Sequence, residues 1–442
     1  MASTYISKTN GTSTNEKIFT FSAWVKRSGV NSTDTLISQY TDDATRMKIL
    51  FSSDNYLQVF QRDGGSTRTN ILTNRKFADP SAWYHVMIVC DNTQSSTDRV
   101  KIYINGVQET SFQTAQYPYS STLTTINANS KVVTIGASLD DSGNPEAFFE
   151  GCMSHVHYCD GTSLAPTVFG STDSVTGEWQ INTSPSFTPG VNGFTILKDG
   201  NTITDQSANS NNWSLTAGTI TKSEDNPSNV FCTINLLDNY FSQATFSNGN
   251  TKIQTGSSNE SYTTSTLGAS SGKFYCEMKL ASSTSTNKTR VGITSVTSTS
   301  TSNWLGVNNK QWSYREDGRT TNNSSNYSGT WSSFTSGDII MMAMDLDNSK
   351  LYYGKNGTWQ NSGVPTSGST GTGGLSLTAG ETYFFAIGDE TGGYSVCEFN
   401  FGNGYFGSTQ ISSAGTNASG IGIFEYDVPT GYTALSTKGL NL

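Results

Sequence analysis

The stretch VKIYINGVQ, residues 100–108, decides the fold class of this chain. Apolar side chains stand at every second position from Val100 to Ile104, the period of two that places successive side chains on opposite faces of a strand. Asn105 and Gly106 follow directly, and this pair favours a tight hairpin turn because both of its positions need a positive φ. The stretch therefore predicts an antiparallel hairpin with one apolar face.

The same alternation recurs upstream. In FTFSAWVKR, residues 19–27, we expect one face of a strand to carry Phe19, Phe21, Ala23 and Val25. Short strands of this kind, separated by turns rich in Gly, Asn and Ser, are typical of antiparallel β-sandwiches. Helical periodicity is nearly absent from the chain.

The second half of the chain contains a segment whose pattern is similar to one in the first half. Residues 337–360, GDIIMMAMDLDNSKLYYGKNGTWQ, predict a strand, a short polar turn and a second strand, followed by another Asn-Gly pair at Asn356 and Gly357. The pattern parallels residues 83–108 but is too divergent for a solenoid repeat. The sequence therefore predicts an all-β protein with two antiparallel β-sandwiches of similar architecture.

Composition shifts suggest four segments along the 442 residues. We expect a first sandwich over residues 1–165 and a second over 236–410. Residues 166–235 contain weaker strands among turn residues, and the sequence leaves them as a linker, a small β module or an extension of the first sandwich. Residues 411–442 form a C-terminal tail in which we expect one short strand.

Two family resemblances rest on these strands. The first segment resembles a laminin-G-like, concanavalin-A-type jelly roll through FTFSAWVKR (19–27), AWYHVMIVCD (82–91) and VKIYINGVQ (100–108). The second half resembles a SPRY domain through SGKFYCEMKL (271–280), RVGIT (290–294), WSYREDG (312–318), GDIIMMAMDLDNSKLYYGKNG (337–357) and YFFAIGDE (383–390). The resemblances imply a concanavalin-A-like jelly roll joined to a SPRY-like sandwich.

The region that joins them carries a third resemblance. GCMSHVHYCDGTSLAPTVFGSTDSVTGEWQ (151–180), DQSANSNNW (205–213) and GYTALSTKGL (431–440) are similar to virion proteins of tailed phages, especially marine ones. That similarity implies a virion surface appendage: a tail fibre, an adhesin or a head fibre. Its implied partners are other virion proteins and a host glycan or receptor, and its implied state is a homo-oligomer, with a trimer favoured. A purely architectural head or tail component is the alternative.

Charge excludes some partners. Charged residues make up 14% of the chain, and 26 Lys and Arg against 35 Asp and Glu give a net charge of -9. This balance argues against a basic patch for nucleic acid and against docking on an anionic membrane. The longest apolar run, Ile339 to Met344, fits one strand rather than a membrane span. No signal peptide is visible at the start, so we expect synthesis in a host cytoplasm and release in the virion by lysis.

Aromatic residues interleaved with Asn give the best candidate for a binding site. Stacking on aromatic rings, with amides bonding the hydroxyl groups, is a common way to hold a sugar. The candidates in the second half are Trp304, Trp312, Tyr314, Tyr327, Trp331 and Trp359. Asparagines at Asn322, Asn323 and Asn326 lie among them. The alternative is that Trp312 and Trp331 are core or edge residues of the sandwich.

Metal binding has two weaker candidates. If residues 151–160 form a regular strand, His155, His157 and Cys159 share one face, and imidazole and thiolate are ligands that Zn²⁺ prefers. Ca²⁺ is a candidate cofactor because hard oxygen ligands are abundant, at Asp42, Asp43, Asp91, Asp140 and Asp141. No other cofactor is expected.

Enzymatic activity is not expected. A glycosidase needs two carboxylates about 5–10 Å apart, and no strand carries them on one face in a suitable pattern. One Gly-x-Ser-x-Gly string is centred on Ser270, but no helix follows it as a nucleophile elbow requires.

Overall fold

The computed structural model describes residues 3–198, 200, 202–241, 243–256, 260–284, 288–297, 302–327, 329–390 and 392–442. The chain divides into two compact units, residues 1–222 and 223–442. In the described ranges all regular structure is β-strand or 3₁₀ turn, with no α-helix. The predicted fold class, all-β with antiparallel sandwiches, is confirmed.

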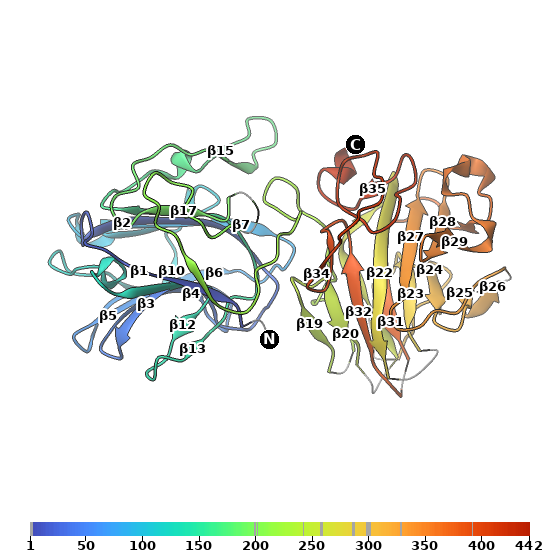
Figure 1. Cartoon of the computed structure of the whole chain (residues 1–442), viewed down its shortest axis with the longest axis horizontal. Helices are drawn as coiled ribbons and strands as arrows, with labels where there is room; N and C mark the ends of the chain where they lie inside the picture. The colour runs from blue at the N-terminus through green and yellow to red at the C-terminus, as the bar shows by residue number, and fades with distance from the viewer. Residues whose placement is uncertain are drawn as a thin grey trace. The chain divides into compact units, whose positions relative to one another are not determined.

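The first unit is built from two large antiparallel sheets, A and B, which lie one over the other in Figure 1. Sheet A runs in the order β10 (Phe112–Gln116), β6 (Ser66–Lys76), β5 (Tyr56–Asp63), β4 (Thr45–Phe51), β3 (Asp34–Asp42), β11 (Val132–Ile135), β1 (Tyr5–Thr9) and β18 (Ser214–Ala217). Sheet B runs in the order β17 (Phe194–Ile196), β14 (Gly151–Asp160), β2 (Ile18–Arg27), β7 (Trp83–Asp91), β8 (Val100–Ile104) and β9 (Val107–Gln108).

The predicted apolar faces form the core between these sheets. Phe19, Phe21, Ala23 and Val25 of β2 are all fully buried in it, together with alternate residues of β8. The turn between β8 and β9 has φ of 49° at Asn105 and 78° at Gly106, as the Asn-Gly pair predicted.

A third layer covers the outer face of sheet B, and we call this segment, residues 161–192, the first cover. It contains η3 (Pro166–Val168) and the hairpin of β15 (Gly170–Thr172) and β16 (Trp179–Ile181), which lies above β2 and β17 in Figure 1. Phe169 and Phe187 of the cover pack on Met87 and Val89 of β7. This layer explains why β2 and β7 are buried on both faces instead of alternating.

A buried imidazole joins the first cover to sheet B. His85 on β7 is stacked between Trp24 of β2 and Trp179 of the cover, with ring centroids 5.1 and 5.9 Å away. Trp179 donates its Nε1–H to His85 Nδ1 at 3.1 Å, so Nε2 carries the proton and donates to Ser22 Oγ at 2.8 Å. Burial lowers the pKa of His85 to about 3, which keeps the ring neutral.

The middle of the chain is shared between the units. β17 pairs with β14, and β18 pairs with β1, so the strands between residues 166 and 222 extend the first unit. Residues 223–235 lie in the second unit. The smaller elements of the first unit are β12 (Ser138–Leu139), β13 (Pro145–Glu146), η1 (Ser96–Asp98) and η2 (Thr125–Asn127).

The second unit also has two large sheets, C and D (Figure 1). Sheet C runs in the order β19 (Thr245–Ser247), β20 (Lys252–Gln254), β32 (Ser395–Asn400), β22 (Lys273–Ser283), β27 (Ile339–Asp345), β28 (Lys350–Lys355) and β29 (Thr358–Trp359), with β30 (Leu375–Ser376) beside β28 and β35 (Thr433–Ala434) beside β22. Sheet D runs in the order β21 (Ser261–Ala269), β31 (Tyr383–Asp389), β23 (Arg290–Thr294), β24 (Gln311–Arg315), β25 (Thr320–Asn322) and β26 (Ser325–Tyr327). The remaining elements are β33 (Tyr405–Phe406), β34 (Thr409–Gln410), η4 (Gln360–Ser362), η5 (Pro365–Thr370) and η6 (Gly439–Asn441).

The C-terminal segment covers the outer face of sheet C, and we call residues 421–435 the second cover. Phe424, Val428 and Tyr432 pack there on Tyr275 of β22 and Met341 of β27. The sequence predicted a short strand around residues 421–426, where the structure has only an isolated bridge between Ile423 and Asn403. The short strand of the tail is β35, which pairs in parallel with β22.

A buried carboxylate holds the second cover. Glu277 on β22 is fully buried and accepts the backbone N–H groups of Glu425 and Tyr426, both at 2.9 Å. It also accepts the Tyr275 hydroxyl at 2.9 Å and Asn400 Nδ2–H at 3.1 Å. Burial raises the pKa of Glu277 to about 7, although the four donors act in the opposite direction.

Candidate functional site

The hairpin of β25 and β26 forms one edge of sheet D. Its two turn residues, Asn323 and Ser324, have φ of 51° and 59°, the left-handed region that a two-residue hairpin of this type needs. Asn322 stands opposite Ser325 in the register, and Tyr327 stands opposite Thr320. Because side chains alternate along a strand, Asn322, Ser325 and Tyr327 share one face of the hairpin.

Hydrogen bonds tie the hairpin to the loop that precedes β24. Asn322 Nδ2 donates to the carbonyls of Asn309 and Gln311 at 2.9 and 2.7 Å. The backbone N–H of Ser324 donates to the Gly306 carbonyl at 2.9 Å. These bonds hold both the turn and the Asn322 amide in one orientation.

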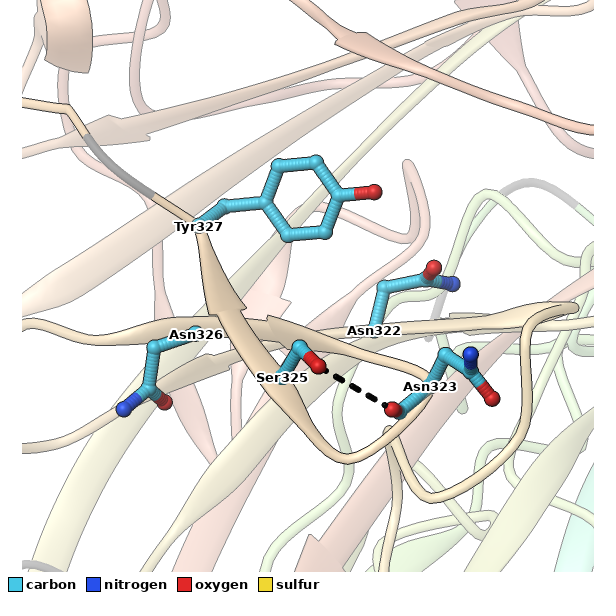
Figure 2. A pocket seen from close by; sticks show the side chains of 5 residues that line it. All are labelled: Asn322, Asn323, Ser325, Asn326 and Tyr327. Atoms are coloured by element: carbon cyan, nitrogen blue, oxygen red, sulfur yellow. Dashed lines mark hydrogen bonds between the residues drawn. The ribbon is translucent and has the colours of Figure 1, made fainter.

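A shallow pocket of about 320 Å³ lies on this hairpin. Its volume falls at the small end of the range of about 300–1,000 Å³ that ligand sites occupy. Figure 2 shows the side chains that line it: Asn322, Asn323, Ser325, Asn326 and Tyr327. All five are uncharged and each carries an amide or a hydroxyl group, so the pocket offers hydrogen bonds without formal charge.

Tyr327 supplies the aromatic surface of the pocket. The residue is 43% exposed, and its ring makes a T-shaped contact with Trp312, with the centroids 4.7 Å apart and the planes at 60°. Trp312 is 3% exposed and belongs to the core of the second unit. A buried partner therefore restrains the Tyr327 ring and leaves much of it open to solvent.

The polar groups of the pocket are largely uncommitted. Within the described residues, the side-chain amides of Asn323 and Asn326 have no hydrogen-bond partner. Ser325 Oγ reaches only the Asn323 carbonyl, at 3.4 Å, which is the bond drawn in Figure 2. A ligand with several hydroxyl groups finds both donors and acceptors here.

The other predicted aromatics are engaged within the unit. Tyr314 is fully buried, donates its hydroxyl to the Ser332 carbonyl and packs in the core, so its ring has no face for a ligand. Trp331 is half-buried against Tyr314, with centroids 5.9 Å apart. The alternative weighed for Trp312, a core position, is the one that the structure shows.

Trp304 and Trp359 are also half-buried. The Arg290 guanidinium lies over the Trp304 ring, with its Cζ 4.2 Å from the ring centroid. Trp359 packs beside Tyr275 under the second cover, with centroids 6.3 Å apart. Of the six predicted aromatic residues, Tyr327 is the one that the pocket contains.

One strand-borne cation close to the hairpin, Arg290, lies on its opposite face. Arg290 on β23 donates to Thr321 Oγ1 at 3.2 Å, and Thr321 alternates with Asn322 along β25. The Arg290 guanidinium is already paired with Glu390, whose pKa it helps to hold below its usual range. Its charge is therefore neutralised away from the pocket.

The predicted histidine cluster lies on a strand that is not regular. β14 shifts register between Ser154 and His157, and His155 has a φ of 49°, so it is the extra residue of a β-bulge. The bulge breaks the alternation that was expected to align His155 with His157 and Cys159. This difference follows from backbone geometry that period-two counting does not detect.

The partners of these side chains are structural. His157 is buried under Phe169 and bonds Thr195 Oγ1 at 2.9 Å, and burial lowers its pKa to about 3. Cys159 Sγ donates to the Thr188 carbonyl at 3.1 Å. In the part of the chain that the structure describes, no three His, Cys, Asp or Glu side chains gather that could hold a metal ion. The six cysteines are free thiols in the structure.

The acidic residues considered for Ca²⁺ are found in turns and ion pairs. Asp91 accepts the Thr93 backbone N–H at 3.0 Å, and Asp140 accepts that of Ser142 at 2.8 Å. Asp43 and Asp141 both bond the Arg46 guanidinium. Asp42 accepts the N–H of Ala44 at 2.9 Å.

Comparison with known families gives a match within the first unit. Residues 1–169 match the model of the family described as the concanavalin A-like lectin/glucanases superfamily, Laminin_G_3. The predicted resemblance to a laminin-G-like jelly roll is confirmed for this part of the chain. No curated protein matches the chain.

Several solved structures are similar to part of the chain. They include the SPRY domain of human HERC1 (18% identity, 38% of this chain and 96% of that one, TM-score 0.30). A heptameric SAP-like pentraxin from Limulus polyphemus has 17% identity over 37% of this chain and 72% of its own, with a TM-score of 0.28. Domain 4 of AbnA, a GH43 extracellular arabinanase from Geobacillus stearothermophilus in complex with arabinotriose, has 16% identity over 35% of this chain and 65% of its own, with a TM-score of 0.27.

None of the helical turns in the described part of the chain is long and apolar enough to cross a membrane.

Proposed function

We propose that this chain is a surface component of a phage virion and binds a carbohydrate of its host through the β25–β26 pocket. The observation that carries the proposal is the pairing of the exposed Tyr327 ring with the unbonded side-chain amide of Asn323 in one pocket. An aromatic ring stacks on the C–H face of a sugar, and amides bond its hydroxyls.

The family of the first unit supports carbohydrate as the ligand class. Residues 1–169 match a superfamily whose description names lectins and glucanases. Membership of such a family does not by itself assign a ligand, because function lies in sites and not in folds. The pocket of the second unit supplies such a site, and we propose binding without catalysis.

The setting on a virion rests on the sequence resemblance of the joining region. In this setting the partners of the chain are other virion proteins, and the protein assembles as a homo-oligomer, with a trimer favoured. Its low content of charged residues, 14%, suits a polar contact surface that adapts to a neutral ligand.

The experiment that tests the binding proposal is a glycan array probed with the full chain, followed by titration of each positive glycan in solution. We expect at least one glycan to bind the native protein and to lose binding to the Tyr327→Ala variant. Binding that is unchanged by this substitution would place the site elsewhere.

One observation favours the architectural alternative. Of the aromatics expected to contact a ligand, Trp312 and Tyr314 are buried in the core and stabilise the unit itself. Cryo-electron microscopy of the virion distinguishes the two functions. Adhesion predicts that the β25–β26 hairpin faces solvent, whereas architecture predicts that neighbouring subunits cover it.

A further inference from the structure

We infer that the β25–β26 pocket takes an uncharged saccharide and rejects saccharides that carry carboxylate or sulfate groups. This inference rests on the proposed function and specifies its ligand class. It is carried by the fixed orientation of one amide, the absence of charge among the lining residues and the electronic character of the ring.

The Asn322 side chain presents a fixed acceptor. Both of its Nδ2 bonds run to backbone carbonyls, those of Asn309 and Gln311 at 2.9 and 2.7 Å. Its Oδ1 has no partner among the described residues, and Figure 2 shows this oxygen on the side of the amide nearer Tyr327. The amide cannot turn over without leaving two backbone carbonyls unbonded.

A fixed acceptor favours a ligand group that can donate a hydrogen bond to it. A hydroxyl of a neutral sugar donates to Asn322 Oδ1 and still accepts from the amide of Asn323. A carboxylate or sulfate oxygen only accepts, so beside Asn322 Oδ1 it would meet a second acceptor and lose its hydration. Polyhydroxyl ligands therefore satisfy the pocket, and anionic groups do not.

The charges on the protein also disfavour an anionic ligand. The five lining residues are uncharged, and Arg290 lies on the opposite face of β25, paired with Glu390. The net charge of -9 adds a general repulsion of anions. No cation of the lining is available to offset the desolvation of an acidic group.

The exposed ring of Tyr327 also favours a neutral sugar over an anion. The face of an aromatic ring is electron-rich, so it attracts the weakly positive C–H groups of a pyranose and repels an anion. Tyr327 offers such a face, restrained by its edge contact with Trp312. The best ligand thus has one apolar face for Tyr327 and hydroxyl donors directed to Asn322.

The test compares matched oligosaccharides that differ only in charge. Glucose and galactose oligomers are titrated against the full chain beside the corresponding glucuronate and galacturonate oligomers, at low and moderate salt. We expect at least one neutral oligomer to bind at least tenfold more tightly than its acidic counterpart. We also expect its affinity to change less than twofold with salt, because no ion pair forms.

A charge-introducing variant gives an independent readout. Ser325→Lys adds a cation at an exposed position on the face that carries Asn322 and Tyr327, and we expect it to raise the affinity for the acidic oligomers at least fivefold at low salt. Ser325→Gln is the matched control, which lengthens the side chain without adding charge and should not raise the affinity for the acidic oligomers.

The outcomes separate the inference from the proposed function. Tighter or equal binding of the acidic oligomers by the native protein would overturn the inference and leave carbohydrate binding in place. If no oligomer and no arrayed glycan binds, the proposed function itself fails. Neutral selectivity that persists when Tyr327 is replaced by alanine would overturn the assignment of the selectivity to this pocket.

Discussion

The first and second covers both bury the outer face of a sheet, but a neutral base holds the first and a buried acid holds the second. Each lays a segment of chain over the outer face of one sheet and buries apolar side chains there. The first is joined to its sheet by a neutral imidazole, His85, stacked between two indole rings. The second is held by a carboxyl group, Glu277, that collects backbone N–H groups from the cover itself.

The difference gives the two covers opposite responses to pH. Burial lowers the pKa of His85 from 6.5 to about 3, so the folded first unit releases the proton that the unfolded chain holds in this interval. Burial raises the pKa of Glu277 from 4.5 to about 7, so the folded second unit keeps a proton that the unfolded chain has lost. The first contact therefore weakens in acid and the second weakens toward neutral pH.

The largest expected effect comes from removing the carboxyl group. Glu277→Leu leaves four donors without this acceptor, among them the N–H groups of Glu425 and Tyr426. We expect the free energy of unfolding of the second unit to fall by about 3–5 kcal/mol. Chemical denaturation measures the loss, and amide hydrogen exchange should place it at residues 425 and 426.

Glu425→Gln is the matched control for that variant. It changes a neighbouring carboxylate but keeps the Glu425 backbone N–H that Glu277 accepts. We expect a change below about 0.5 kcal/mol. Equal losses in the two variants would show that Glu277 does not hold the cover.

The second-largest expected effect is the pH dependence of the stability of the two covers. Between pH 4.5 and 7 the Glu277 contribution should decrease by up to about 3 kcal/mol as the pH rises, and should be flat above pH 7. Between pH 6.5 and 4 the contribution of His85 should decrease as the pH falls. Amide protection at β16 and at residues 425–426, corrected for intrinsic exchange, measures the two covers separately.

Two buried aspartates require a control in that experiment. Burial raises the pKa of Asp34 in the first unit and of Asp389 in the second to about 6, so both titrate in the same direction as Glu277. Glu277→Gln removes one titration and leaves the aspartates unchanged. A pH profile at residues 425–426 that is identical in this variant and in the native protein would exclude Glu277 as its source.

A smaller loss is expected when the aromatic contact of the first cover is removed. Trp179→Ala deletes the bond to His85 Nδ1 and one of the two rings that stack on it. We expect the first unit to lose about 2 kcal/mol, less than Glu277→Leu costs the second, because the cover keeps Phe169 and Phe187 in contact with sheet B.

The control for Trp179→Ala lies in the same hairpin. Val175 is 91% exposed between β15 and β16, so Val175→Ala should leave stability unchanged. Denaturation of the two variants side by side measures the contact. If Trp179→Ala destabilised the protein as much as Glu277→Leu, the proposed ranking of the two contacts would be wrong.

Most of the fold could be predicted because it follows from alternation. Phe19 and Phe21 point to the core as period two requires, and Asn105-Gly106 turns as its φ preferences require. The covers could not be predicted in this way. Their apolar residues contact the outer faces of the sheets through tertiary packing. No local sequence pattern indicates that residues 161–192 cross sheet B, or that Glu277 accepts hydrogen bonds from the second cover.

The candidate site was predicted in part, and the errors have physical causes. Trp312 and Tyr314 are two apart on β24, a spacing that places both on one face and favours the core, and the structure buries both. The bulge at His155 requires a positive φ that no local pattern announces. Tyr327, Asn322, Asn323 and Asn326 were identified because they lie close together in a turn-rich stretch, but Ser325 was not.

The smallest stability effect and the most specific functional effect are expected at the uncovered edge of sheet D. Tyr327→Ala removes one edge contact with Trp312, for which we expect a loss of about 1 kcal/mol, because no cover or hydrogen-bond network depends on it. Glycan affinity should fall at least about tenfold, which is 1.4 kcal/mol of binding free energy. Denaturation and solution titration measure the two quantities.

Tyr394→Ala makes that comparison quantitative, since Tyr394 is 37% exposed in the same unit but does not line the pocket. It should lose similarly little stability and no affinity. The Glu277→Gln variant, assayed at pH 5 where the native carboxyl is protonated, should also bind as the native protein does, because the pocket lies at the edge of sheet D and Glu277 lies under the cover of sheet C. If Glu277→Gln instead weakened binding as much as Tyr327→Ala, the covered and uncovered faces would be coupled, and the pocket would not be an independent site.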